Sequence, residues 1–200
     1  RDWNADISGD IKLAQEGSLC HLCGKKLELK RGIELGHVFK LGSLYSEKFN
    51  IKISGPNQQT ITPIMGCYGI GIDRILACAS ENHITENSLN WPMSIAPYNI
   101  HIVDLNENVE NKQISDSIKQ ISQHGINILL DDREETPGKK FADADLIGIP
   151  IKIILSDRNL KKNQVEIINR STNETSYAPI ETFYKDAINL YDQLIKECSI

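Results

Sequence analysis

The sequence predicts an α+β part built mainly from antiparallel strands, followed by an α/β part in which strands and helices alternate. Before residue 90 the clearest apolar patterns have a period of two, which is typical of half-buried strands. Beyond that point short apolar strands alternate with helix-spaced isoleucines, as in units that cross over between parallel strands. The parts join near residue 95, because Pro92 and Pro97 lie too close together to continue a helix.

Glycine-punctuated loops and a short hairpin are expected over residues 1–30, which contain one CxxC pair. Alternation of apolar and polar residues, turn dipeptides and helix spacing then define the other elements of the N-terminal part. In order, these are a strand at 33–41, a helix or turn through 45–48, renewed alternation at 51–53, a turn at 55–57, a long strand at 60–71 and a helix at 72–79.

The C-terminal part is expected to form a largely parallel sheet covered by helices. Its predicted elements are a strand at 100–105, a helix at 114–121, a strand at 126–130, a helix at 141–146, a strand at 151–155, a turn at 157–159, a strand at 165–168 and a closing helix at 179–196. Gly125, Gly148 and Pro150 mark the ends of the first two helices.

Composition excludes several classes of protein. The 200 residues are 40% hydrophobic and 24% charged, which is typical of a globular chain and not of a disordered one. A formal net charge of −5 argues against a surface that is basic throughout, although it allows a local basic patch. No apolar run approaches the ~20 residues of a membrane span. Five cysteines without a framework-like spacing indicate reduced thiols and a cytoplasmic location.

The start of the chain indicates a longer protein. It begins at Arg1, without Met, in a polar stretch that has no obvious structural start. We therefore expect the C-terminal piece of a larger chain, and no secretion leader is visible.

The segment GCYGIGIDR, residues 66–74, is the most informative stretch. Gly66, Gly69 and Gly71 follow one another at the end of a predicted strand, where missing side chains let a flat ligand lie against the backbone. Arg74 follows on the first turn of a helix, and its guanidinium suits a polyphosphate. Spacing alone favours a glycine-rich bulge with a surface arginine, and the segment is not a Rossmann fingerprint.

Four blocks in a fixed order carry a resemblance. They are RGIELGHVFKLGSLYSEKFN (31–50), PIMGCYGIGIDR (63–74), NWPMSIAPYNIHIV (90–103) and LLDDREETPGKKFADADLIGIPIKIIL (129–155). Together they resemble bacterial-type prolyl-tRNA synthetases, with GCYGIGIDR as motif 3 of the class II aminoacyl-tRNA synthetases. The resemblance implies a remnant of the class II catalytic domain at residues 29–95 and an anticodon-binding domain at 96–200. Residues 1–28 resemble the tail of an inserted editing domain.

The resemblance also implies roles in proline activation. Arg74 would act as the catalytic residue that contacts the ATP phosphates, and Gly69 and Gly71 would form the floor of the adenosine site. The residues that would line the proline pocket are Glu34, His37, Phe39 and Cys67. Without the resemblance, His37 fits a core histidine and Cys67 a small buried hydrophobe. The implied chemistry uses ATP and Mg²⁺, in a homodimer without a membrane anchor. Motifs 1 and 2 are absent, so this chain is not expected to aminoacylate by itself.

A charged loop is implied to read the anticodon of tRNA(Pro). Arg133 and Lys140 would contact guanine edges, Glu135 would accept hydrogen bonds from guanine, and Phe141 would stack on a base. Thr136 stands where the family has arginine, and Lys139 and Lys152 would add positive charge. Without the resemblance, the charge run fits a solvated surface loop.

No metal is expected. Cys20 and Cys23 supply only two of the four ligands that zinc usually takes, and His21 between them cannot easily join them. Two other functions remain open, a stand-alone anticodon-domain-like RNA-binding or accessory module and a nucleotide-binding domain of unrelated metabolism. An intact GCYGIGIDR segment argues against the first, and the block at 129–155 argues against the second.

Overall fold

The computed structural model describes residue 9 and residues 13–106 and 111–199. The chain divides into two units, residues 1–71 and 72–200, which are described separately. Within the described residues, no helix is long and apolar enough to cross a membrane.

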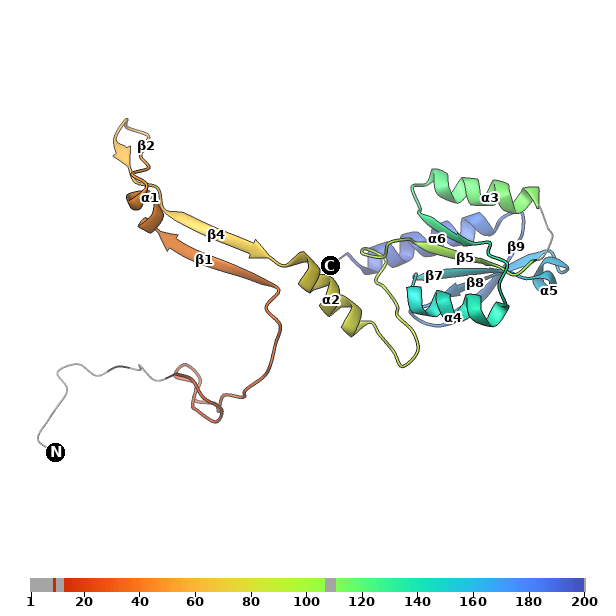
Figure 1. Cartoon of the computed structure of the whole chain (residues 1–200), viewed down its shortest axis with the longest axis horizontal. Coiled ribbons are helices and arrows are strands. Elements are labelled where there is room, and N and C mark those ends of the chain that lie inside the picture. The colour runs from red at the N-terminus through yellow and green to blue at the C-terminus, as the bar shows by residue number, and fades with distance from the viewer. Residues whose placement is uncertain (1–8, 10–12, 107–110, 200) are drawn as a thin grey trace, which may run out of the picture. The chain divides into compact units, whose positions relative to one another are not determined.

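The first unit is built on a two-stranded antiparallel ribbon. Strand β1 (Gly36–Gly42) pairs with β4 (Met65–Ile70), and Leu41 is left unpaired at a bulge just before Gly42. The ribbon carries the short helix α1 (Leu44–Lys48) and a small hairpin of β2 (Ile53–Ser54) and β3 (Thr60–Ile61) (Figure 1). The turn expected at 55–57 is confirmed, since the Gly55 amide donates to the Gln59 carbonyl oxygen at 2.7 Å.

The prediction of a single long strand over 60–71 is wrong. The structure divides it into β3 and β4, which pair with different partners. Pro63 lies between them, and a proline has no backbone N–H to continue a ladder of hydrogen bonds. The predicted strand at 33–41 is confirmed from Gly36 onward.

The second unit is a mixed five-stranded sheet in the order β6-β5-β7-β8-β9, with helices on both faces (Figure 1). Strands β5, β6 and β7 run parallel, and β8 and β9 continue antiparallel. The strands are β5 (Ile100–Asp104), β6 (Ile128–Asp131), β7 (Ile151–Leu155), β8 (Gln164–Asn169) and β9 (Glu174–Pro179). The helices are α2 (Ile72–Asn82), α3 (Lys112–Gln123), α4 (Pro137–Ile147), α5 (Asp157–Leu160) and α6 (Phe183–Glu197).

The two faces of this sheet differ in chemistry. One is an apolar core in which α3 and α6 pack together over isoleucines such as Ile102 and Ile153, and this core contains the fully buried Phe183. Side chains alternate along a strand, so the neighbouring residues His101 and Lys152 point to the opposite face. Helix α4 covers that face (Figure 1). The face of the sheet under α4 therefore carries polar and charged side chains.

The prediction for the end of the chain is partly wrong. The closing helix begins at Phe183 and not at Pro179, because residues 174–179 form the edge strand β9. Proline can end a strand at a sheet edge, where its missing N–H is tolerated. The helix predicted at 141–146 is confirmed and begins earlier, at Pro137, which takes the first helical position. It ends at Gly148, whose φ of 79° is left-handed.

Candidate functional site

The first unit brings most of the expected proline-site residues onto one face of the ribbon. His37 and Phe39 lie two residues apart on β1, so their side chains point to the same face of the ribbon. Their cross-strand partners on β4 are Gly69 and Cys67. Directly opposite residues of an antiparallel pair share a face of the sheet. The rings of His37 and Phe39 stack with centroids 3.9 Å apart and an interplanar angle of 13°. Gly69 has no side chain, so the backbone opposite the imidazole stays open.

Glu34 joins this group from the segment before β1. Its Oε1 lies 3.4 Å from Nδ1 of His37. The His37 side chain is 48% exposed and Cys67 is also exposed, so neither a core histidine nor a buried cysteine describes this face in the structure. The arrangement offers an aromatic surface, a carboxylate and an imidazole, which suit a small ligand with an amine and an apolar ring.

Glycine has different roles at Gly36, which begins β1, and at Gly71, which belongs to the segment 66–74. A Cβ on Gly36 would lie 2.9 Å from the backbone oxygen of Gly69, so close packing of the strands requires glycine there. The amide of Gly71 donates to the carbonyl oxygen of Leu35 at 2.8 Å and fixes the end of the ribbon. Arg74 lies in the first turn of α2, within the second unit.

A second site lies at the carboxyl ends of β5 and β6. The chain leaves β5 toward α3 and leaves β6 toward α4, so the two connections cover opposite faces and open a crevice between the strands. The crevice has a volume of about 710 Å³. It is lined by Asp104, Leu105 and Asn106 after β5, and by residues 132–137 and Lys140 after β6. Three of the four expected anticodon residues therefore line one cavity, namely Arg133, Glu135 and Lys140.

Arg133 is held by two carboxylates. Its Nε and one terminal nitrogen donate to both oxygens of Asp131 at 2.8 Å, and the same terminal nitrogen donates to Asp143 at 2.9 Å. The hydrogen bonds from Arg133 lower the pKa of Asp131 from its usual 3.8 to about 2. The Asp131 side chain is 5% exposed and that of Arg133 is 47% exposed. The guanidinium is thus fixed in place while part of it still faces solvent.

Lys140 is buried, and its amine is used inside the protein. Its Nζ donates to the backbone oxygen of Asp104 and lies 3.3 Å from that of Asp131. It therefore joins the carboxyl ends of β5 and β6 beneath the crevice. Lys139, by contrast, is on the surface and pairs with Glu135. In this structure Lys140 shapes the floor of the crevice and does not present its amine to solvent.

Phe141, the fourth expected anticodon residue, lies on the charged face of the sheet. The Lys152 ammonium is 5.6 Å from the centre of its ring, within the range of a cation–π contact. Lys152 also pairs with Asp145 at 3.1 Å, and Arg170 pairs with the same carboxylate at 3.2 Å. Burial lowers the pKa of His101, which lies on this face with its Nδ1 buried and without a hydrogen-bond partner.

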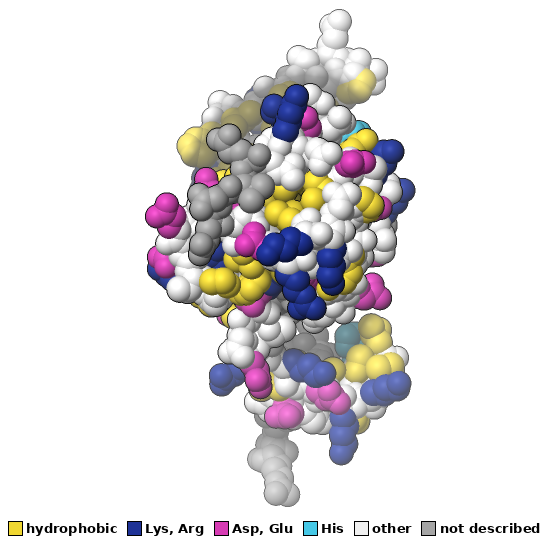
Figure 2. Space-filling model, turned by 90° about the vertical axis from the view of Figure 1, so that its right-hand side faces the viewer, with side chains coloured by type: hydrophobic (Ala, Val, Ile, Leu, Met, Phe, Trp, Pro, Cys, Tyr) yellow, Lys and Arg dark blue, Asp and Glu magenta, His cyan; other side chains and the backbone are white. Residues whose placement is uncertain are grey.

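A neighbouring hollow of about 420 Å³ contains residues that the sequence did not single out as functional. Arg158, Lys162 and Tyr177 line it, together with Phe141 and Glu166. Tyr177 is 56% exposed, and Glu166 accepts a hydrogen bond from Asn159 at 3.1 Å. Within the described part of the chain, Arg158 and Lys162 form no ion pair, unlike Arg133, Lys139 and Lys152. Figure 2 views the molecule from the side on which α5 lies and shows Lys and Arg side chains gathered on this face.

The sequence did contain a signal for this hollow. The run DRNLKK at 157–162 places three cations within six residues, although its residue pattern by itself predicts only a turn. Nothing in the sequence pattern indicated a role for Tyr177, because the pattern does not predict the strand β9 on which it lies.

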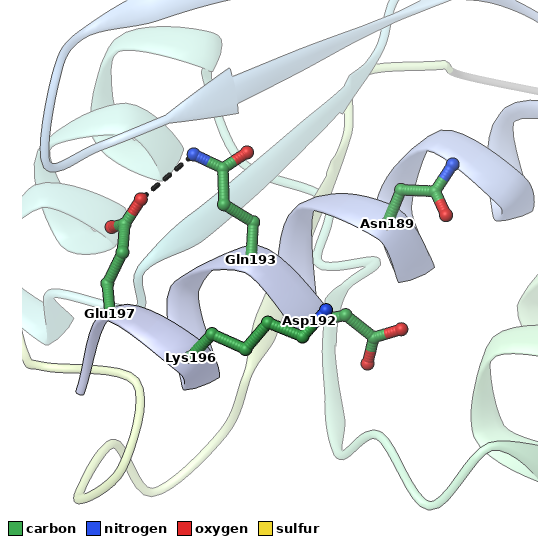
Figure 3. A pocket seen from close by; sticks show the side chains of 5 residues that line it. All are labelled: Asn189, Asp192, Gln193, Lys196 and Glu197. Carbon is green, nitrogen blue, oxygen red and sulfur yellow. Dashed lines mark hydrogen bonds between the residues drawn. The ribbon is translucent and has the colours of Figure 1, made fainter. Parts of the chain in front are cut away.

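A further hollow, along α6, offers less chemistry. It is lined by residues of that helix alone, and Gln193 there donates to Glu197 at 2.9 Å (Figure 3). That bond is an i, i+4 contact of the kind found on ordinary helix surfaces. Among the residues that the structure describes, no three His, Cys, Asp or Glu side chains converge on a point that could hold a metal.

Two family matches divide the chain between residues 83 and 95, whereas the compact units of the fold divide it at 71/72, so α2 lies in the first match and in the second unit. Residues 8–83 match the tRNA synthetase class II core domain (G, H, P, S and T), and residues 95–189 match the anticodon binding domain. The ribbon with its glycine-rich end lies in the first match, and the sheet with its charged face lies in the second.

The relatives agree with these matches. The chain is 46% identical over 177 residues to the proline–tRNA ligase of Elusimicrobium minutum. The alignment covers 87% of this chain and 31% of that protein. It is 42% identical over 183 residues to the proline–tRNA ligase of Brachyspira hyodysenteriae, covering 90% and 32%. The chain thus spans about a third of the length of the curated relatives it matches.

Solved structures share the fold. The prolyl-tRNA synthetase of Giardia lamblia, in complex with prolyl-adenylate, superposes with a TM-score of 0.65 at 23% identity over 82% of this chain and 38% of that one. The enzyme of Cryptosporidium parvum, complexed with L-proline and AMP, gives 0.69 at 19% identity over 82% and 36%. In sequence, the chain holds a class II tRNA synthetase core segment followed by an anticodon binding domain, and over about 90% of its length it is similar to proline–tRNA ligases.

Proposed function

We propose that this chain forms part of an enzyme that activates proline with ATP and ligates it to tRNA(Pro). The observation that carries the proposal is the identity of 46% to a proline–tRNA ligase, which extends over 87% of the chain. The stand-alone RNA-binding module is less well supported, because such a module has no use for the ribbon that gathers His37, Phe39 and Cys67.

In the proposed reaction, the proline carboxylate attacks the α-phosphate of ATP, and pyrophosphate leaves. The 3′-terminal ribose hydroxyl of tRNA(Pro) then attacks the prolyl carbonyl, and AMP leaves. No covalent intermediate with the protein is needed, so positioning and charge neutralisation dominate. Mg²⁺ neutralises phosphate charge when bound with ATP. Arg74 is proposed to contact the phosphates, Gly69 and Gly71 to floor the adenosine site, and Glu34, His37, Phe39 and Cys67 to line the proline pocket.

We propose that the anticodon is read at the carboxyl edge of the five-stranded sheet. Arg133 and Glu135 would contact base edges in the crevice, and Phe141 would stack on a base. Lys140 is assigned as a positioning residue, since its amine is bound to backbone carbonyl oxygens. Arg158 and Lys162 would bind the RNA backbone, and Tyr177 would stack on a further base.

The boundaries proposed for the full architecture are an editing-domain tail at 1–28, a catalytic segment at 29–95 and an anticodon-binding domain at 96–200. A homodimer and a cytoplasmic location are proposed for the complete enzyme. Both follow from the family and from the cysteine usage of the sequence.

Binding of RNA by this chain tests the anticodon site. The probes are the anticodon stem-loop of tRNA(Pro) and the same RNA with both anticodon guanines changed to cytosine. We expect a preference for the first of roughly 5- to 150-fold for each base that is read. Arg133→Ala should reduce that preference. The double change of Arg158→Ala and Lys162→Ala should weaken both RNAs alike and flatten the salt dependence. Equal binding of both RNAs by the unchanged chain would contradict the proposal.

A further inference from the structure

An apolar hollow of about 460 Å³ lies between helix α4 and the edge strand β6, and it has no part in the function proposed above. Its walls are Leu129 and Leu130 from β6 and Leu146 and Ile147 from α4, and we call it the edge hollow. Three of these wall residues are exposed, and Leu146 is 68% exposed. Apolar walls that face water gain free energy when a ligand covers them, and a few polar groups beside them then fix its orientation.

His101 lies at the edge hollow and lacks a partner. The residue lines the hollow although it is only 2% exposed. Its Nδ1 is buried and accepts or donates no hydrogen bond in the part of the chain that the structure describes. Buried polar atoms without a partner are rare and costly, so such an atom marks a place where a group from outside the chain can bind. Burial lowers the pKa of His101, and the neutral imidazole has one donor and one acceptor nitrogen.

Arg133 connects the edge hollow with the crevice, because its side chain lines both. The carboxylates of Asp131 and Asp143 hold the guanidinium in place while 47% of the side chain stays exposed. A planar guanidinium can stack on a base as well as read its edge. An RNA strand that is read in the crevice therefore passes this arginine, and a base next to the anticodon meets the edge hollow.

Asp143 gives the edge hollow a preference among bases. It lines the hollow, and its Oδ2 accepts a hydrogen bond from Arg133 at 2.9 Å. Its side chain is about one-third exposed, and two carboxylate oxygens can accept several hydrogen bonds. Adenine, guanine and cytosine each carry an exocyclic amino group that can donate to it, and uracil carries none.

We propose that the edge hollow binds one unstacked base of the anticodon loop, a base that lies next to the anticodon and carries an exocyclic amino group. This inference rests on the proposed reading of the anticodon in the crevice. The base lies between the apolar side chains of β6 and α4, its amino group donates to Asp143, and its ring contacts His101. Arg133 separates it from the base that is read in the crevice.

Anticodon stem-loops of tRNA(Pro) that carry a single abasic nucleotide test the proposal. Each loop position outside the anticodon is changed in turn, and the affinity for this chain is measured by fluorescence anisotropy. We expect the abasic nucleotide at one position next to the anticodon to weaken binding by about 5-fold or more. Uracil at that position should weaken binding in the same direction, whereas a different base with an amino group should keep most of the affinity.

Two substitutions locate the lost base. Leu146→Asp puts a carboxylate into the apolar wall, and the abasic nucleotide should then change the affinity by less than about 2-fold. Leu76→Asp, at an exposed leucine of α2, is the matched control and should keep the full effect of the abasic nucleotide. His101→Phe should reduce that effect without lowering the free energy of unfolding, because the nitrogen that it removes has no partner.

The outcomes separate this inference from the anticodon proposal. If no abasic position outside the anticodon weakens binding while the preference for the anticodon guanines is present, the edge hollow does not bind a base. The inference also fails if Leu146→Asp and the unchanged chain lose the same affinity. If the unchanged chain shows no preference for the anticodon guanines, the anticodon proposal and this inference are both wrong.

Discussion

Arg133 illustrates how a single side chain combines two tasks at the crevice. Its bidentate contact with Asp131 and its bond to Asp143 fix the guanidinium at the carboxyl end of β6. Planar guanidinium and carboxylate groups match each other closely, which makes this pairing stronger than an ordinary hydrogen bond. Asp131 is nearly inaccessible to solvent, so its charge depends on this partner. The arginine that we propose for base reading is therefore also part of what holds its own strand end together.

Stability in acid should reveal this pair. The pKa of Asp131 is about 2 in the folded protein, below its usual 3.8. A lowered pKa contributes stability above the unfolded value and loses it as the pH falls through the folded value. We expect a contribution of about 2 kcal/mol at neutral pH that disappears between about pH 4 and pH 2. Urea unfolding followed by circular dichroism at several pH values measures it.

Two substitutions calibrate that measurement. In Asp131→Asn the pH-dependent part should be missing, so its stability should fall less than that of the unchanged chain as acid is added. Asp132→Asn removes an exposed neighbouring carboxylate and should leave the slope as it is. If Asp131→Asn and the unchanged chain lose stability in parallel below pH 4, the ion pair with Arg133 does not stabilise the ionised form of Asp131.

Arg74 is the residue on which the proposed ATP chemistry depends most. Changing Arg74→Ala in the complete synthetase should lower proline-dependent exchange between ATP and pyrophosphate by about 100-fold or more, the loss expected when one charge-stabilising donor is removed. Lys119→Ala, on the exposed side of α3, is the matched control and should leave exchange unchanged. Exchange near the normal rate in Arg74→Ala would remove this arginine from the site.

At the scale of elements, α4 defines the charged face of the sheet. The helix starts with proline, ends at a left-handed glycine and covers His101 and Lys152. Arg170 donates from below to the backbone oxygens of Ala144 and Ile149 at the end of this helix, at 3.3 and 3.5 Å. The Ala144 oxygen also accepts from the Gly148 amide at the C-cap, at 3.1 Å, so Arg170 is a second donor to it. Arg170 thus links the end of α4 to the sheet through backbone oxygens.

The adjacent lysines of α4 separate a buried from an exposed contribution. Lys140→Met keeps the length of the side chain but leaves the oxygens of Asp104 and Asp131 without their donor. We expect a loss of roughly 1–3 kcal/mol in the free energy of unfolding. Lys139→Met breaks only the surface pair with Glu135 and should cost less than about 1 kcal/mol. Urea titration of both variants tests this. Equal losses in the free energy of unfolding would show that the buried contacts of Lys140 do not stabilise the fold more than a surface ion pair does.

At the scale of the whole molecule, residue patterns predicted the fold class and most elements. Period-two alternation located β1, and the proline and glycine boundaries of α4 were visible in the sequence. The pairing of β1 with β4 was not, because register depends on contacts between segments far apart in the chain. Strand β9 has no apolar alternation, because ETSYAP is polar and lies at a sheet edge, where only Ala178 is buried.

The candidate sites were predictable to different degrees. The residues Glu34, His37, Phe39 and Cys67 followed from the resemblance. The ribbon places the last three on one face, and Glu34 contacts His37 from the segment before β1. The use of Lys140 could not be foreseen, because a lysine in a charged run gives no sign that its amine reaches two carbonyl oxygens. The lack of an ion pair at Arg158 and Lys162 within the described residues could not be foreseen either, because it depends on where the carboxylates of the fold lie.

Separate sites for activation and for tRNA selection give the last prediction. The residues proposed for proline and those proposed for the anticodon belong to different family domains, residues 8–83 and 95–189. In the complete synthetase, the double change of Arg158→Ala and Lys162→Ala removes two cations that make no ion pair within the described chain, so folding should be unaffected. Charging of tRNA(Pro) should fall and should become less sensitive to salt, because fewer phosphates are neutralised.

Exchange between ATP and pyrophosphate should remain near normal in the same preparation, since that reaction needs no tRNA. Lys119→Ala again serves as the control for loss of a surface charge. Charging that stays normal would place the RNA elsewhere on the domain. If exchange fell together with charging, the substitution would act on both functions, and the proposed separation between the core segment and the anticodon-binding domain would be wrong. Measuring the two rates on one enzyme sample distinguishes these outcomes directly, because errors in enzyme concentration cancel in their ratio.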